Sequence, residues 1–209
     1  IDASSNGLQV GPPDAPVDRA ALAVDAAAAT IDTAIERDAD LLVAHHGLVW
    51  GGLDRVTDRT YERIAALIEN DVALYVSHLP LDGHQEFGNA AGLASELGLV
   101  EPEPFGQHGD EYVGQRGRFT EPQSVANLRE QLDALRQGDR STQVLQHGPD
   151  QIEDVAIVTG SGADWLAEAD AVGADALITG EGKQQLYHDS REAGVTVFLA
   201  GHYLSFIHI

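Results

Sequence analysis

The chain has 209 residues, of which 43% are hydrophobic, and it carries a formal net charge of −22 from 34 acidic and 12 basic residues. The apolar content is enough for the core of one large domain or two small ones and excludes an acidic disordered protein. The negative charge would repel phosphate backbones and anionic lipids, so we expect neither nucleic acid nor a membrane as the main partner.

No apolar stretch reaches the roughly 18 residues that span a bilayer, and no signal peptide pattern begins the sequence, so we expect a cytoplasmic protein. Lys183 is the only lysine. An acidic, lysine-poor surface suits a salt-rich cytoplasm, where charges are screened within about 3 Å at 1 M salt, so we expect a halophilic protein. Because the chain starts at Ile1 and contains no methionine, we expect it to be a fragment of the encoded protein.

The first half of the chain alternates strand and helix patterns. Strands are predicted at 8–10, 41–44 and 72–76, and a further helix at 88–97. The two helices between the strands are marked by apolar residues at helical spacing, with Thr57 as the N-cap of the second: Val24, Ala28, Ile31 and Ile35, then Tyr61, Ile64, Ala65 and Ile68. This order predicts a βαβαβ unit with a parallel sheet.

From Pro102 to Arg118 the sequence turns to proline, glycine and polar residues, which predicts a boundary. Beyond it we expect a helix capped by Thr120 and marked by Val125, Leu128, Leu132 and Leu135. Strands at 155–158, 176–179 and 195–200 follow, with helices between them.

The segment 38–46 aligns with 173–181, so the second half repeats the first in element order. We therefore predict an α/β protein of two similar lobes with mixed, mostly parallel sheets, which face each other across a cleft. The N-terminal lobe would cover 1–101, the linker 102–118, and the C-terminal lobe 119–209.

Three predicted strands end in histidine or aspartate. His45 and His46 follow 41–44, the segment Ser77–Asp82 follows 72–76, and His202 follows 195–200. The carboxyl ends of strands line the ligand crevice of open α/β sheets. Imidazole suits zinc, iron, copper or nickel, and a carboxylate can bridge two ions; with no cysteine in the chain, a metal would bind nitrogen and oxygen donors. The pattern favours a metal site, although each histidine could also be an ordinary core or surface residue.

Several segments resemble the GTP cyclohydrolase 1 type 2 family, also called Nif-three-like proteins. They occur in the family's order over nearly the whole chain. The matching segments are Asn6–Val10, Ala44–Gly47, Ser77–Asp82 with His84 and Gly88–Asn89, Thr159–Gly162, Thr179–Glu181 and Gly201–Tyr203.

The resemblance implies two linked αβα lobes with a metal site in the cleft between them. The site would hold two divalent ions, zinc, iron, manganese or nickel, and the subunits would assemble into a toroidal homohexamer. Carried over by position, the ligands are His45, His46, Asp82 and His202. The family also has a glutamate four residues after the last of these histidines, where this chain has Phe206. The resemblance therefore indicates a weakened second metal position and a truncated C-terminal lobe.

Glu181, His78 and His84 are weaker candidates for contacts with a substrate. His78 and His84 flank Asp82, and Glu181 follows a strand end. Structural roles compete with these interpretations, since a glutamate at a helix start commonly pairs with the helix dipole. No Ser-His-Asp order or phosphate-binding loop is present in the sequence, so it identifies no catalytic residue.

Two metal ions lower the pKa of a bound water and polarise the bond that it attacks. We therefore predict a metal-dependent hydrolase acting on a nucleotide or similar small molecule. A non-enzymatic metal carrier or metallocofactor-assembly chaperone is the alternative, because the sequence shows no clear substrate pocket with acid–base groups.

Overall fold

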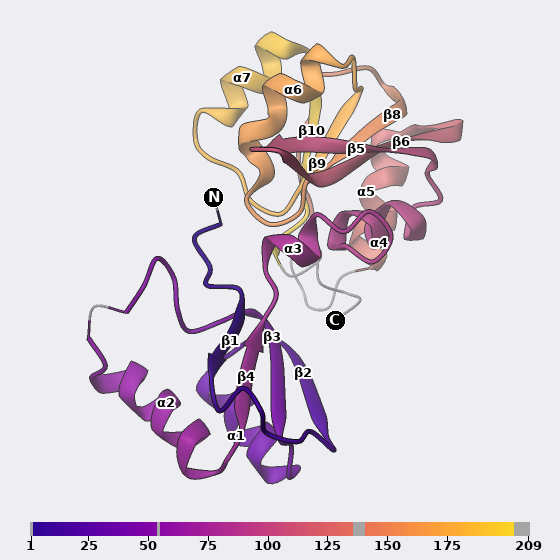
Figure 1. The fold of residues 1–209 in the computed structure, drawn as a ribbon. Helices are drawn as coiled ribbons and strands as arrows, with labels where there is room; N and C mark the ends of the chain where they lie inside the picture. Colours follow the sequence, from indigo (N-terminus) through magenta and orange to yellow (C-terminus); the bar gives the residue numbers. More distant parts are fainter. Residues whose placement is uncertain (1, 54, 136–140, 203–209) are drawn as a thin grey trace. The chain divides into compact units, whose positions relative to one another are not determined.

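The computed structural model describes residues 2–53, 55–135 and 141–202. These form two compact units, which are described separately: the first extends to Leu81 and the second begins at Asp82 (Figure 1). The helices of the described residues include none that is both long and apolar enough to cross a membrane.

The first unit has one four-stranded sheet in the order β1-β4-β3-β2. Strand β1 is antiparallel to β4, and the other two pairs are parallel. The elements in chain order are β1 (Gly7–Val10), β2 (Ala20–Asp25), α1 (Ala28–Glu36), β3 (Leu41–His46), α2 (Asp58–Glu69) and β4 (Ala73–Val76).

The first of the three parallel strands in this sheet is not the one that was expected. Residues 8–10 form the antiparallel β1, and the first parallel strand is β2, which contains Val24, expected in a helix. The run 20–29 is rich in alanine, whose helix preference is overridden here by pairing with β3. Helix α1 begins only at Ala28, so the strand carries Asp25 to the carboxyl edge of the sheet.

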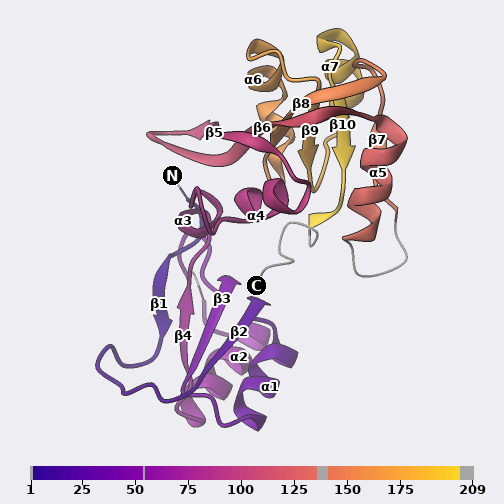
Figure 2. The same ribbon diagram turned by 90° about the vertical axis from the view of Figure 1, so that its right-hand side faces the viewer.

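Helices α1 and α2 cover one face of this sheet (Figure 2). Their buried residues Ile31, Ala34 and Leu67 pack against the strands, in a core that includes Leu42, Ala44, Leu74 and Val76. The residues that alternate with these point the other way, and Leu8, Leu22 and Tyr75 are exposed there. Among the described residues, the first unit thus has two layers rather than the three expected.

The second unit has a six-stranded sheet in the order β5-β6-β8-β9-β10-β7. Only the pairs β8–β9 and β9–β10 are parallel, so the expectation of mostly parallel sheets holds for the first unit alone. The strands are β5 (Val100–His108), β6 (Glu111–Ser124), β7 (Gln143–Leu145), β8 (Gln151–Ile157), β9 (Ala176–Thr179) and β10 (Thr196–Leu199).

Helices cover both faces of this second sheet (Figure 1). Leu93 and Leu128 pack on one face against Ile157, Ile178 and Phe198. The helical elements in chain order are α3 (Leu79–Asp82), which spans the boundary, α4 (Asn89–Glu96), α5 (Val125–Ala134), the 3₁₀ helix η1 (Gly162–Trp165), α6 (Leu166–Ala171) and α7 (Leu186–Ala193).

The expected linker at 102–118 is instead most of the β5–β6 hairpin, and the boundary lies near residue 81. Its prolines lie in the edge strand β5, where a missing N–H is tolerated. Its glycines allow close packing, since a Cβ on Gly114 would lie 2.2 Å from the Ile157 carbonyl oxygen. Helix α5 is capped by Ser124, whose hydroxyl accepts from the Asn127 N–H; Thr120, the expected cap, lies in β6.

The aligned segments 38–46 and 173–181 both fold as a turn and an inner strand. Strand β3 pairs in parallel with β4, and β9 pairs in parallel with β10. This part of the predicted repeat agrees with the structure, and it places the residues after each strand at a carboxyl edge of its sheet.

Candidate metal centre

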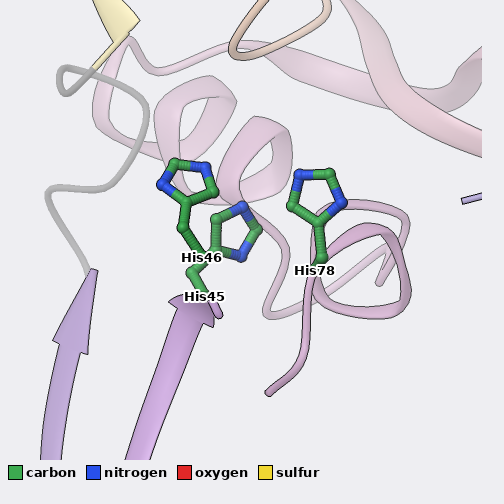
Figure 3. A group of neighbouring side chains, drawn as sticks. All are labelled: His45, His46 and His78. Carbon is green, nitrogen blue, oxygen red and sulfur yellow. The ribbon is translucent and has the colours of Figure 1, made fainter. Parts of the chain in front are cut away.

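Three histidines meet at the carboxyl edge of the first sheet (Figure 3). His45 and His46 end β3, and His78 follows the neighbouring parallel strand β4, where Ala44 is opposite Val76. The centroid of the His45 ring lies 4.7 Å from that of His46 and 4.9 Å from that of His78. One ring nitrogen of each histidine lies within 4.8 Å of the others, so the group could hold a metal ion.

The Nδ1 atom of each ring has an oxygen partner. His45 Nδ1 lies 2.9 Å from the carbonyl oxygen of Ser77, His46 Nδ1 lies 2.7 Å from Asp25 Oδ1, and His78 Nδ1 lies 2.8 Å from Asp2 Oδ1. An acceptor at Nδ1 fixes the Nδ1–H tautomer, so Nε2 is the nitrogen that would bind a metal. Metal-binding histidines are typically held in this way by carboxylates or backbone carbonyls.

Asp2 is held as an anion beside His78. Its carboxylate accepts hydrogen bonds from Asn6 Nδ2, the Ser4 and Leu79 amides and the His78 ring. Burial alone would raise the pKa of this carboxyl, but these hydrogen bonds outweigh burial and lower its pKa to about 2. The carboxylate therefore brings negative charge close to the three imidazoles.

The loop after β3 is shaped by Gly47 and Gln9. A Cβ on Gly47 would lie 2.4 Å from Gln9 Oε1 and 2.5 Å from Val76 Cγ2. Gln9 Oε1 accepts hydrogen bonds from the amides of Leu48 and Val49. This position therefore requires glycine, which explains the Ala44–Gly47 segment in physical terms.

Trp50 forms one side of the histidine group. Its ring centroid lies 5.0 Å from that of His78 in an edge contact and 6.0 Å from that of His46. The indole Nε1 donates to the Gly47 carbonyl, so the half-exposed ring is fixed in place.

His202 lies in the second unit, after β10. Its Nδ1 is 3.1 Å from Glu181 Oε1, and the other oxygen of Glu181 accepts a hydrogen bond from the Ser161 hydroxyl. Gly160 lies against the ring, since a Cβ there would be 3.5 Å from His202 Cε1. Glu181, expected to contact a substrate, therefore holds the predicted ligand His202 in this structure.

Asp82 is also described with the second unit. Its Oδ1 accepts a hydrogen bond of 2.6 Å from Asn89 Nδ2 and a long one of 3.5 Å from the Thr159 hydroxyl. The structure thus brings together His45 and His46, adds His78, and describes Asp82 and His202 in the other unit. That all four predicted ligands share one centre stays a prediction, and Phe206 lies outside the described residues.

His84 is not part of the histidine group of the first unit. Its Nδ1 accepts hydrogen bonds from the amides of Glu86 and Phe87, and its ring packs on Phe87. These contacts shape a turn. A role for His84 in substrate binding remains a prediction.

Asp2 and Asp25 are the residues of this site that the sequence did not indicate. Asp25 pairs across the sheet with His46, but the strand that carries it was expected to be helical. Asp2 reaches His78 across 76 positions of sequence. A correct assignment of β2 would have placed Asp25 at the same edge as His46, whereas no local signal identifies Asp2.

Comparison with known proteins identifies the family of this chain. A family model described as Duf34/NIF3 (NGG1p interacting factor 3) matches residues 1–205. A Halobacterium salinarum protein named GTP cyclohydrolase 1 type 2 homolog is 61% identical over 203 residues, which are 97% of this chain and 80% of that protein. A homolog of the same name from Deinococcus radiodurans is 39% identical and covers 97% of this chain and 76% of its own.

Solved structures show the same fold. Protein ybgI, described as of unknown function, has 33% identity and a TM-score of 0.88 over 98% of this chain and 81% of its own. The crystal structure of a Thermus thermophilus protein has 37% identity and a TM-score of 0.86 over 98% of this chain and 79% of its own. On the match of family model, sequence and fold over nearly its full length, this chain belongs to the Duf34/NIF3 family.

Proposed function

We propose that this protein is a metal-dependent hydrolase that uses two divalent transition-metal ions to act on a nucleotide or a similar small molecule. The observation that carries the proposal is the meeting of His45, His46 and His78, each with its Nδ1 held by an oxygen. The names of the homologs support the substrate class.

The donor set fits a transition metal. Imidazole nitrogens favour zinc, iron, manganese or nickel over calcium, which takes oxygen ligands. In the proposed centre Asp82 and His202 join His45 and His46 as ligands. Such ions, when bound, make a water more acidic and polarise the bond to be cleaved.

The chain's own residues would orient these ligands. Asp25 holds the His46 ring and Glu181 holds the His202 ring, while Asn89 and Thr159 donate to the Asp82 carboxylate. Contacts of this kind fix the ring or carboxylate orientation and typically change metal affinity by about 10–100-fold when removed. The fixed Trp50 ring limits the space on one side of the imidazoles.

The experiment has two stages. The protein is purified without chelator in molar KCl and its metals are counted by elemental analysis, beside the double variant His45→Ala/His46→Ala and the control His188→Ala. It is then assayed for ring opening of GTP and for hydrolysis of phosphoesters. Metal lost in the double variant, with turnover that depends on metal, supports the proposal.

Failure would take either of two forms. Full metal content in the double variant contradicts the metal centre itself. Metal that binds through these histidines, produces no turnover and passes to an apo-acceptor protein would favour the carrier or assembly chaperone. Since the family resemblance implies a toroidal homohexamer, we also propose that oligomer, and light scattering coupled to gel filtration measures its mass.

A further inference from the structure

We propose that His78 is itself a metal ligand, and that with His45 and His46 it forms a three-imidazole site lying wholly within the first unit. The inference rests on the proposed function, because it concerns how that centre holds its metal. It changes the role of His78, which sequence reasoning placed beside the metals as a weak contact to substrate.

The three rings are directed toward one another. Figure 3 shows the side of the His78 ring that carries Nε2 turned toward the rings of His45 and His46. The His78 centroid is 4.9 Å from that of His45 and 5.6 Å from that of His46. Two nitrogens on one zinc ion lie roughly 3–4 Å apart for Zn–N bonds of about 2.0–2.1 Å. The nitrogens of the observed group lie within 4.8 Å of one another, so they would have to approach by about 1 Å to share one ion.

Hydrogen bonds hold both the ring and the backbone of His78 in place. Its Nδ1 is bound to Asp2, and its backbone N–H donates to Asn6 Oδ1 at 2.7 Å. Asn6 in turn donates to the other oxygen of Asp2. The Asp2 side chain is 14% exposed, so the carboxylate that accepts from this ring is partly shielded from solvent. Removing a carboxylate from water is unfavourable unless it is hydrogen-bonded, and four donors fulfil that condition here.

His84 provides the contrast within the same segment of sequence. Its Nδ1 accepts two backbone N–H groups and its ring packs on Phe87. The two rings therefore differ in tautomer: an acceptor at Nδ1 places the proton on Nδ1, whereas donors at Nδ1 place it on Nε2. Only the first arrangement gives an Nδ1–H imidazole whose Nε2 lone pair is directed to a metal.

Charge and coordination number agree with a ligand role. Three neutral imidazoles leave the full charge of a dication, and Asp2 and Asp25 supply two nearby negative charges through His78 and His46. Three protein ligands with one open position are the usual arrangement of a catalytic zinc site, in which the open position takes water or substrate. The site would therefore select zinc, nickel or cobalt over magnesium and calcium.

The test compares His78→Gln with the control His84→Gln. Zinc affinity is measured by competition with a chromophoric chelator, and Co²⁺ is used as a spectroscopic probe of the ligand set. We expect His78→Gln to lower affinity by more than about 100-fold, beyond the 10–100-fold typical of an outer contact, and to change the Co²⁺ spectrum. Asp2→Asn should lower affinity by about 10–100-fold and keep the spectrum. His84→Gln should change neither.

A second measurement, on the His202→Ala variant, covers the case in which His78→Gln fails to fold, which circular dichroism would show. Because His202 is removed, X-ray absorption of this variant loaded with one equivalent of zinc should still give about three imidazole ligands, from His45, His46 and His78. One or two imidazoles, or a folded His78→Gln variant with unchanged affinity and Co²⁺ spectrum, would overturn this inference while leaving the proposed function intact. Undiminished zinc binding by His45→Ala/His46→Ala would instead overturn the proposed function.

Discussion

The two units hold their histidines by the same kind of contact but in different surroundings. In the first unit the Asp2 side chain that holds His78 is 14% exposed, and the Asp25 side chain that holds His46 is 34% exposed. In the second unit the Glu181 side chain that holds His202 is 57% exposed. Water competes more for a contact to an exposed carboxylate than for one to a shielded carboxylate. The histidines of the first unit are thus held in a more enclosed setting, and in the proposed centre we expect this unit to dominate metal affinity.

The largest expected effect follows directly. His45→Ala/His46→Ala should lose essentially all bound metal, because it removes two of the three imidazoles of the first unit, whereas His202→Ala should keep the more tightly bound ion. Elemental analysis after gel filtration in molar KCl measures both, with His188→Ala as a matched control in the second unit. If His202→Ala loses as much bound metal as the double variant does, the first unit does not dominate metal affinity.

The next effect concerns the ion held less firmly. Phe206 stands where the resemblance implies a glutamate, so the ligand set lacks one negative charge for a second dication. Phe206→Glu should raise the metal content from about one towards about two ions per chain. Phe206→Gln, which has the same length without the charge, is the control, and circular dichroism checks folding. Tight binding of two ions by the unmodified chain would show that another group completes the site.

The site residues that the sequence predicted correctly depend on local features, and those it missed depend on contacts between distant positions of the chain. His45 and His46 were predicted because a strand pattern and its carboxyl end are local features. The strand β2 was missed because its alanines suit a helix as well, and with it Asp25 was missed. Asp2 depends on a contact across 76 positions, for which no periodicity exists.

The fold, too, was predictable where its signals are local. The alternation of strands and helices, and hence an α/β class, was predictable from hydrophobic patterns. The hairpin at 102–118 was not, because proline and glycine ordinarily signal loops. Here an edge position tolerates Pro104, and the neighbouring strand leaves no space for a side chain at Gly114.

A smaller effect is expected from crowding the loops next to His46 in the first unit and next to His202 in the second. Gly47→Ala places a Cβ 2.4 Å from Gln9 Oε1, and Gly180→Ala places one 2.6 Å from the Gly160 carbonyl oxygen and 2.9 Å from His202 Cα. Each should lower the free energy of unfolding by about 1–3 kcal/mol, as overpacking does. Chemical denaturation followed by circular dichroism measures this.

Only Gly47→Ala should also weaken the tighter metal site, because it displaces the loop that follows His46. Neither Gly47 nor Gly180 has a positive φ, so steric crowding by the added Cβ is the expected cause of both losses. Equal losses of zinc affinity in Gly47→Ala and Gly180→Ala would contradict the expectation that the first unit dominates metal affinity.

The smallest effect is the pH dependence that Asp2 contributes. Burial opposes ionisation of this carboxyl, but hydrogen bonds from Asn6, Ser4, His78 and Leu79 lower its pKa from 3.8 to about 2. Because the folded-state pKa is depressed, its contribution to stability is fully present above pH 3.8 and is lost as the pH falls toward 2. With solvent screening, we expect about 1 kcal/mol for this group. The apo protein should therefore lose more stability between these pH values than Asp2→Asn, measured by urea unfolding in molar KCl. Parallel curves for the two proteins would mean that Asp2 titrates normally and that the first unit does not hold a charged carboxylate beside His78.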